Sequence, residues 1–378
     1  MRKEYLLAPG PTQVPPEVLL EMARPVFHHR TAEYRKLHQD VLEDLKTVFR
    51  TRNDVYTMTS SGTGAMETAV VNVLSPGEKA LVVQGGKFGE RWVNLCKAFG
   101  AQPIVIDVPW GKAVDPEEIR KHLKADPSIG AVYTQLCETS TGVVFDMQAI
   151  GAVVKETAAI LVCDGISAVG AIPMETDAWG IDMLVSGSQK ALMLPPGLAF
   201  ITVSPKAWKR IDERKPMAFY FDIKKARKNL ATFDNPWTPA VTLVVGLKKS
   251  LEIINARGIE QVWKDHTRLA KAARAAAKAM GLQVFADPPA DCVTAIRLPD
   301  SIDGEALVKR LRKDCGITIA GGQDQLKGKI IRISHMGYAD STDVIIAISA
   351  VEMLLVEMGH KLEIGAGVRA AEMALLGK

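Results

Sequence analysis

Cysteine is scarce in this chain of 378 residues, and its five cysteines form no CxxC or CxxxxC pair. Their odd number and wide spacing argue against a disulfide framework and favour reduced thiols in a cytoplasmic protein. An HExxH motif and a spaced set of cysteines and histidines are also absent. We therefore predict that the chain binds no metal.

Long apolar runs are missing as well. No run approaches 18 residues, and no long apolar segment precedes the turn at Pro9-Gly10. We therefore expect no membrane span, no signal peptide and a cytoplasmic location. The net charge of +4 is small, and the most basic stretch, residues 206–228, also contains acidic residues. This charge distribution predicts neither a nucleic-acid partner nor a membrane partner.

What the sequence does contain is a regular alternation of short apolar runs with segments of helical length. This alternation predicts an α/β domain that is built on a mainly parallel sheet. The expected strands are residues 55–59, 79–83, 102–108, 131–136, 160–164, 183–186 and 198–203.

After residue 240 the pattern changes to long helices and a few strand-like pieces, which predicts a smaller α+β domain. The expected helices and strands are residues 241–256, 260–280 and 343–358, and residues 282–285, 293–297 and 329–334, respectively. We accordingly divide the chain into an N-terminal arm (1–16), a large domain (17–256) and a small C-terminal domain (257–378).

Lys190 and Asp164 occupy comparable places after two apolar runs. Asp164 closes the run that begins at residue 158, and Lys190 follows the run 181–185 within a segment of small residues. A lysine that can form a Schiff base and an aspartate on a neighbouring strand end are what pyridoxal phosphate (PLP) requires. The lysine would hold the aldehyde, and the aspartate would keep the ring nitrogen protonated. The pair therefore predicts a PLP site.

Three further segments are consistent with such a site, but each also has a structural explanation. Ser61-Gly62-Thr63-Gly64 forms either a phosphate-binding loop at a helix N-terminus or an ordinary N-cap turn. Phe88 either stacks on a flat cofactor ring or packs in the core. Thr139 either faces the crevice where parallel sheets bind ligands or belongs to a local turn.

Arg332 lies in the middle of the apolar strand expected at residues 329–334. A cation at such a position needs a partner. A substrate carboxylate that is bound through two hydrogen bonds would serve, and so would a structural aspartate or glutamate. The residues themselves leave both possibilities open.

In combination, these segments resemble the class V (fold type I) PLP-dependent aminotransferases, in particular the alanine–glyoxylate / serine–pyruvate aminotransferase branch. The resemblance runs over nearly the whole chain and implies a mainly parallel seven-stranded sheet with helices on both faces, in a large PLP-binding domain. It rests on the order and spacing of Pro9-Gly10-Pro11-Thr12, Ser61-Gly62-Thr63-Gly64-Ala65-Met66-Glu67, Glu138-Thr139-Ser140-Thr141-Gly142, Asp164-Gly165-Ile166-Ser167, Ser186-Gly187-Ser188-Gln189-Lys190-Ala191 and Arg332.

The resemblance implies roles for individual residues. Lys190 matches the Schiff-base lysine, and Asp164 matches the partner of the pyridine nitrogen. Arg332 matches the arginine that binds the substrate carboxylate, with Pro9 and Gly10 as further substrate contacts. The remaining implied cofactor contacts are Ser61, Gly62, Thr63, Gly64, Phe88, Thr139, Ile166 and Gln189.

Thr238 matches a threonine that reaches the phosphate in the neighbouring subunit, which implies a homodimer with its sites at the interface. Two residues depart from the pattern of some family members. Phe88 stands where they carry a stacking tryptophan, and Asn235 stands where they carry a phosphate-binding tyrosine.

The implied activity is transamination between a small amino acid, with alanine or serine favoured, and a 2-oxo acid such as glyoxylate or pyruvate. Aspartate or aminoethylphosphonate are alternative donors. The same branch includes proteins that are described as soluble hydrogenase small subunits. A non-catalytic, hydrogenase-associated subunit is therefore the alternative from another functional class, and the presence of both Lys190 and Asp164 counts against it.

Overall fold

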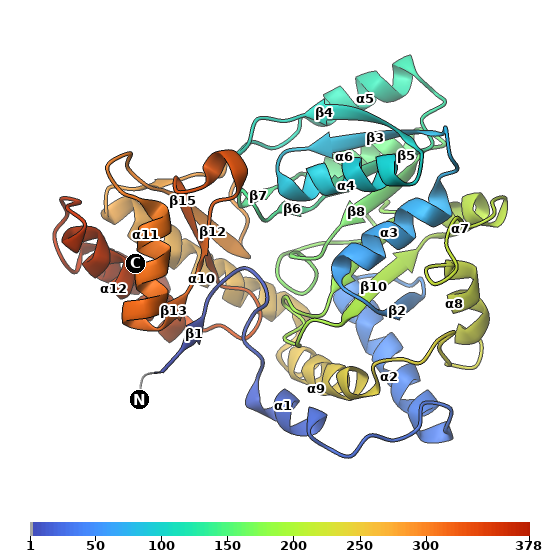
Figure 1. Cartoon of the computed structure of the whole chain (residues 1–378), viewed down its shortest axis with the longest axis horizontal. Coiled ribbons are helices and arrows are strands. Elements are labelled where there is room, and N and C mark those ends of the chain that lie inside the picture. Colours follow the sequence, from blue (N-terminus) through green and yellow to red (C-terminus); the bar gives the residue numbers. More distant parts are fainter. Residues whose placement is uncertain (1–2) are drawn as a thin grey trace.

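The computed structural model describes residues 3–378, and its main feature is a seven-stranded sheet (Figure 1). One strand, β10, runs antiparallel to both of its neighbours, and all other adjacent pairs are parallel. The expected mainly parallel seven-stranded sheet is therefore confirmed. In order across the sheet, the strands are β2 (Val55–Thr59), β10 (Leu198–Val203), β9 (Met183–Gly187), β8 (Ile160–Asp164), β5 (Ala131–Gln135), β3 (Lys79–Gln84) and β4 (Gln102–Asp107).

Both faces of this sheet are covered, because consecutive side chains of a strand point to opposite faces. In β8, Leu161 and Cys163 belong to one hydrophobic cluster, whereas Ile160 and Val162 belong to a second. The helices that contribute to the first cluster include α2 (Ala32–Phe49), α5 (Pro116–Ala125), α6 (Met147–Lys155) and α9 (Val241–Arg257). Those that contribute to the second are α3 (Gly62–Val73), α4 (Lys87–Ala98), α7 (Pro205–Asp212) and α8 (Ile223–Leu230).

A four-stranded antiparallel sheet lies in the C-terminal part of the chain (Figure 1). Its strands, in order, are β11 (Gln283–Val284), β12 (Val293–Arg297), β15 (Ile330–Ser334) and β14 (Ala320–Gly321). The helices that share a third hydrophobic cluster with it are α10 (Ile259–Ala279), α11 (Gly304–Arg310), α12 (Ser341–Glu357) and α13 (Ala366–Leu375).

The N-terminal arm connects these two parts. Strand β1 (Tyr5–Leu6) pairs in parallel with β13 (Ile317–Thr318), and the arm then leads to α1 (Pro16–Met22), which packs on α9. Helix α10 also belongs to both parts, since Trp263 lies in the first cluster and Leu269 lies in the third. The division at residues 256 and 257 stays a prediction.

Several short elements complete the fold. Strands β6 (Cys137–Glu138) and β7 (Val143–Val144) form a small antiparallel hairpin directly after β5. A π-helical turn, η1 (Leu311–Cys315), follows α11, and a 3₁₀ turn, η2 (Asp324–Leu326), precedes β15. Within residues 3–378, no helix has both the length and the apolar character needed to cross a bilayer.

The fold brings the predicted residues to one edge of the large sheet. The parallel strands β5, β8 and β9 are consecutive neighbours, so their carboxyl ends lie together. Asp164 is the last residue of β8, Thr139 follows β6, and Lys190 follows β9. In sheets of this kind the ligand binds outside the carboxyl ends of the strands.

Candidate active site

Lys190 lies in a tight turn directly after β9, and the N-terminal arm fixes this turn. Thr12 donates from its amide to the Gln189 oxygen at 3.1 Å and from Oγ1 to the Lys190 oxygen at 2.9 Å. The lysine side chain is buried, and its Nζ donates a hydrogen bond to the main-chain oxygen of Pro9. The arm and the strand end together therefore set the direction of the lysine.

Gly10 leaves room for the lysine side chain. Its φ of +132° is one that residues with a side chain rarely adopt. A Cβ on Gly10 would lie 2.5 Å from Cε and 2.8 Å from Cδ of Lys190, and it would also overlap Nζ. The two predicted substrate contacts, Pro9 and Gly10, thus border the lysine amine.

Asp164 lies on the strand next to the one that leads to Lys190, and its side chain is also buried. Its Oδ1 accepts a 2.8 Å hydrogen bond from the amide of Ile166. Burial raises the pKa of Asp164 to about 7 and lowers the pKa of Lys190 to about 8. Because burial disfavours both charges, the acid and the amine are both brought near neutral pH. Such a pair has the properties of an acid–base site.

The first turn of α3 has no side-chain cap. Ser61 occupies the N-cap position, but its side chain makes no capping hydrogen bond, and the turn contains no acidic residue. An ordinary N-cap serine would accept a hydrogen bond from an amide of this turn. An uncapped helix N-terminus of this kind is able to bind an anion.

Ile166 and Gln189 both lie against the start of α3. A Cβ on Gly62 would lie 2.6 Å from Cδ1 of Ile166. A Cβ on Gly187 would lie 3.0 Å from Oε1 of Gln189 and 3.4 Å from the Gly62 nitrogen. The Gln189 Oε1 is buried and has no hydrogen-bond partner among the described residues. A buried acceptor of this kind is available to a hydrogen-bond donor.

Thr63 and Phe88 are joined by Arg91, which the sequence analysis did not identify. Arg91 donates from Nη1 to Oγ1 of Thr63 at 3.0 Å, and its Cζ lies 5.0 Å from the centroid of the Phe88 ring. Phe88 is half-buried, so it is not an ordinary core residue. The charge of Arg91 also acts on Asp164, where it opposes the effect of burial on the pKa.

Thr139 lies in the turn of the β6–β7 hairpin and faces the segment that follows Asp164. Its Oγ1 donates a 2.6 Å hydrogen bond to Oγ of Ser167, so the hydroxyl points away from its own turn. Its neighbour Glu138 is fully buried and accepts hydrogen bonds from the amides of Phe88 and Gly89. The hairpin therefore contacts both the start of α4 and the segment that follows Asp164.

Arg332 is buried in β15 and donates all its protein hydrogen bonds to main-chain oxygens. Nε and Nη2 donate to Gly321 at 3.0 and 2.8 Å, and Nη1 donates to Thr139 at 2.8 Å. Across residues 3–378, no carboxylate forms an ion pair with this guanidinium, so the structural aspartate or glutamate considered above is not found. Burial lowers the pKa of Arg332 to about 10.

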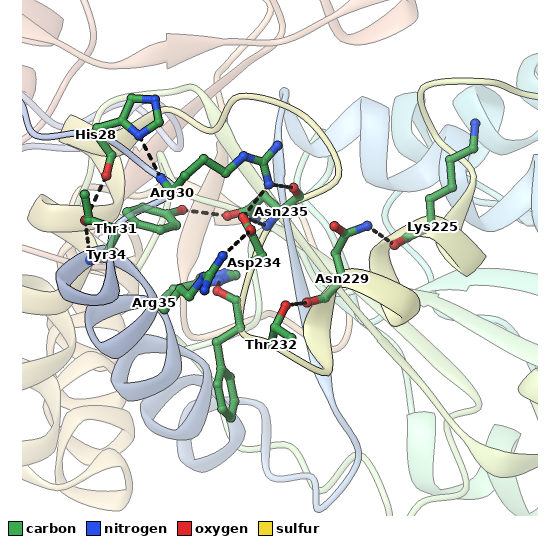
Figure 2. A network of polar contacts seen from close by, with 12 residues as sticks. His28, Arg30, Thr31, Tyr34, Arg35, Lys225, Asn229, Thr232, Asp234 and Asn235 are labelled. Carbon is green, nitrogen blue, oxygen red and sulfur yellow. Dashed lines mark hydrogen bonds and ion pairs between the residues drawn. The ribbon is translucent and has the colours of Figure 1, made fainter.

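Thr238 lines a hollow that neither Lys190 nor Arg332 lines. It is exposed, and the hollow, of about 510 Å³, also has Tyr220 and Trp237 in its lining. Asn235, three residues earlier, is buried and turned inward. Figure 2 shows its side chain facing Tyr34, whose hydroxyl donates to Asn235 Oδ1 at 2.7 Å.

Two residues of the site were missed although their segments had been noted. Glu138 lies in the quoted segment Glu138-Thr139-Ser140-Thr141-Gly142, and Arg91 follows Phe88 by three residues in a helix. A buried acidic residue beside polar site residues, and a basic residue one turn after an aromatic one, are signals that could have identified them.

Comparisons with known proteins identify the family of the chain. The family model for class V aminotransferases matches residues 4–346. The soluble hydrogenase small subunit of Synechococcus sp. (strain PCC 6716) is 39% identical, over 99% of this chain and 98% of that protein. A serine–glyoxylate aminotransferase of Hyphomicrobium methylovorum is 37% identical, over 97% of this chain and 93% of that protein.

Among solved structures, pyridoxamine–pyruvate aminotransferase from Mesorhizobium loti superposes with a TM-score of 0.94 at 30% sequence identity. The superposition covers 100% of this chain and 98% of that chain. The match to the family model extends over most of the chain and includes every predicted site residue. The chain therefore belongs to the class V aminotransferases, a family of PLP-dependent transaminases.

Proposed function

We propose that this protein binds PLP and transfers the amino group of a small amino acid, alanine or serine, to glyoxylate or pyruvate. The observation that carries the proposal is the pairing of Lys190 with Asp164. Both are buried at adjacent strand ends, and the pKa of each is moved toward neutrality, to about 8 and about 7. An amine and a carboxyl group with such pKa values can exchange protons at physiological pH.

The residues around this pair fit the chemical groups of PLP. The start of α3, which no side chain caps, suits a phosphate, and Gln189 is a further phosphate contact that the family resemblance implies. The Asp164 carboxylate accepts a hydrogen bond at Oδ1 from the main-chain amide of Ile166. Its other oxygen remains able to pair with a ring nitrogen. Phe88 offers a half-buried aromatic ring, and Thr139 offers a hydroxyl beside the segment that follows Asp164.

Bound PLP supplies an electron sink for bond cleavage at the substrate Cα. Lys190 would hold the cofactor and, once released by the amino acid, would take the proton from Cα as a neutral amine. A pKa of about 8 gives the amine a substantial neutral fraction near that pH. Asp164 would keep a proton on the ring nitrogen.

Arg332 is suited to orient the substrate. A guanidinium has five N–H groups, and three of them bond to the oxygens of Gly321 and Thr139. One N–H remains on each Nη, which is the number that a bidentate carboxylate needs. Every amino acid and 2-oxo acid carries this carboxylate, so Arg332 would serve both half-reactions.

We also infer that the sites lie at the interface of a homodimer. The support is the position of Thr238, which is exposed and borders a hollow that Lys190 does not line. A threonine with a cofactor-binding role at this place would act on a second copy. A cytoplasmic location and the absence of a metal stay predictions.

The similarity to a soluble hydrogenase small subunit keeps one alternative, in which the fold is a non-catalytic subunit. Purified protein mixed with PLP distinguishes the two functions. A transaminase should gain the absorbance band of covalently bound PLP, which Lys190→Ala lacks, and it should convert glyoxylate to glycine with a suitable donor. We would compare alanine, serine, aspartate and aminoethylphosphonate as donors. Absence of both the band and any product would refute the proposed function.

A further inference from the structure

Glu138 is the most completely hydrogen-bonded acid of the site, although the transamination described above gives it no role. Its side chain is fully buried. Oε2 accepts from the amides of Phe88 and Gly89 at 3.1 and 3.0 Å and from Nε2 of Gln135 at 3.2 Å. Oε1 accepts from the amide and the hydroxyl of Ser140. Every partner is a donor, which suits an ionised carboxylate.

The hydrogen bonds from the amides of Phe88 and Gly89 fix the start of α4. The N-cap residue of this helix is Gly86, which has no side chain to cap it, and Glu138 supplies the missing acceptor from another strand. A Cβ on Gly86 would lie 2.6 Å from Cδ of Glu138, so glycine is required for this approach. The negative charge also suits a helix N-terminus. Glu138 therefore sets the position of Phe88.

The hydrogen bonds from the amide and the hydroxyl of Ser140 fix the turn that holds Arg332. Ser140 bonds to Glu138, and Thr139 between them accepts the hydrogen bond from Arg332 Nη1. The partners of Arg332 are neutral oxygens, and Glu138 is the strongest of the charges that raise the pKa of Arg332 against the effect of burial. The carboxylate thus also balances the charge of the buried guanidinium.

We propose that Glu138 is a positioning residue that holds the ring-stacking Phe88 and the carboxylate-binding Arg332 in one fixed arrangement. The proposal rests on the proposed function, because it assigns the cofactor to Phe88 and the substrate to Arg332. Loss of this carboxylate should make the positions of Phe88 and Arg332 less fixed at the same time. Binding of the cofactor and binding of the substrate should therefore weaken together.

The test is Glu138→Gln, which keeps the shape but turns one acceptor into a donor. We expect the PLP dissociation constant and the KM for the amino acid each to rise about 10-fold or more, since hydrogen bonds to a charged group are lost. Hydrogen exchange of the cofactor-free protein should become faster in residues 87–91. Ser140→Ala, which removes one of the bonds, should act in the same direction by about 2- to 5-fold.

Glu352→Gln is the matched control. Glu352 is also buried and accepts a 2.9 Å hydrogen bond from the amide of Gly367 at the start of α13, in the third hydrophobic cluster. The Glu352→Gln substitution should lower the melting temperature without changing PLP affinity or KM. If Glu138→Gln behaves in this way, Glu138 is merely structural and the proposal is wrong.

A double variant tests the route through Phe88. If Glu138 acts on PLP through the ring, Glu138→Gln should weaken PLP binding little further once Phe88→Ala is present, and additive effects would overturn this route. The amide hydrogen exchange of residues 87–91 is measured on the cofactor-free protein. A wild-type chain that binds no PLP would thus refute the proposed function, whereas unchanged exchange in Glu138→Gln would refute the role of Glu138 by itself.

Discussion

Arg332 donates a 2.8 Å hydrogen bond from Nη1 to the main-chain oxygen of Thr139, across a sequence separation of 193 residues. This bond joins β15 of the four-stranded sheet to the hairpin at the edge of the large sheet. The predicted carboxylate-binding residue is thereby held against a residue that is predicted to lie beside the cofactor ring. The position of Arg332 in the small sheet therefore depends on the position of the hairpin at the large sheet.

Arg332→Lys should weaken the binding of every amino acid and 2-oxo acid substrate. An ammonium group cannot keep the bonds to Gly321 and Thr139 and also bind a carboxylate through two parallel hydrogen bonds. We expect kcat/KM to fall roughly 10- to 100-fold, as for the loss of a charge-assisted hydrogen bond. PLP affinity should remain, because the proposed phosphate contacts lie at α3 and Gln189.

The melting temperature of the same Arg332→Lys preparation serves as the control. A residue with only a structural role would give a less stable protein whose folded fraction has normal kinetics. Normal kcat/KM values in the variant would remove Arg332 from the site.

Asp164→Asn should stabilise the cofactor-free protein at alkaline pH. With a pKa of about 7, the folded chain holds a proton on Asp164 between about pH 4 and pH 7 that the unfolded chain has lost. The contribution of Asp164 to stability therefore falls as the pH rises through this window. At pH 8 the variant, which cannot ionise there, should be more stable by about 1–3 kcal/mol.

Urea unfolding of the two cofactor-free proteins at pH 5 and pH 8 measures this effect. At pH 5 both side chains are neutral in the folded state, so the gap between the two unfolding free energies should be smaller than at pH 8. A gap between the proteins that does not change with pH would contradict the raised pKa. In the presence of PLP, the variant should lose most of its transaminase activity, because its amide cannot hold a proton on the ring nitrogen.

Gly10→Ala should impair the site through Lys190. The added Cβ would overlap Nζ, Cε and Cδ of the lysine, which therefore has to move. We expect kcat/KM to fall at least about 10-fold, since a displaced catalytic group loses its orientation. Gly258→Ala is the control for backbone strain, because Gly258 also has a positive φ, +80°, but open space around it. Equal activity losses in both variants would show that strain, and not contact with Lys190, is the cause.

The residues that the sequence identified best are those whose place follows from a strand boundary. Asp164 and Lys190 come directly after apolar runs, and the parallel sheet then has to bring them to one edge. The partners of Arg332 could not be predicted, because Gly321 and Thr139 contribute main-chain oxygens that no side-chain pattern records. The sequence also left open which way the side chain of Asn235 points, which depends on Tyr34 and Thr57.

The dimer model predicts complementation between two inactive variants. Thr238→Glu would place a negative charge beside the phosphate of the partner subunit and should prevent PLP binding there. In a mixed dimer with Lys190→Ala, one of the two sites keeps both Lys190 and Thr238. Co-expression of the two variants should restore up to about a quarter of the wild-type activity, as random pairing of two subunits gives. A mixture as inactive as its parents would contradict a shared site.

The proposed function is tested most directly by the turnover of Lys190→Ala with serine or alanine and glyoxylate, followed by the formation of glycine. Lys190 is the residue that would move the proton at the substrate Cα, and acid–base assistance alone contributes ~10²–10⁴-fold. We predict a fall in kcat of at least this size in a protein that remains folded and still binds PLP without a covalent bond. A variant that forms glycine at close to the wild-type rate would contradict the role of Lys190 in transamination.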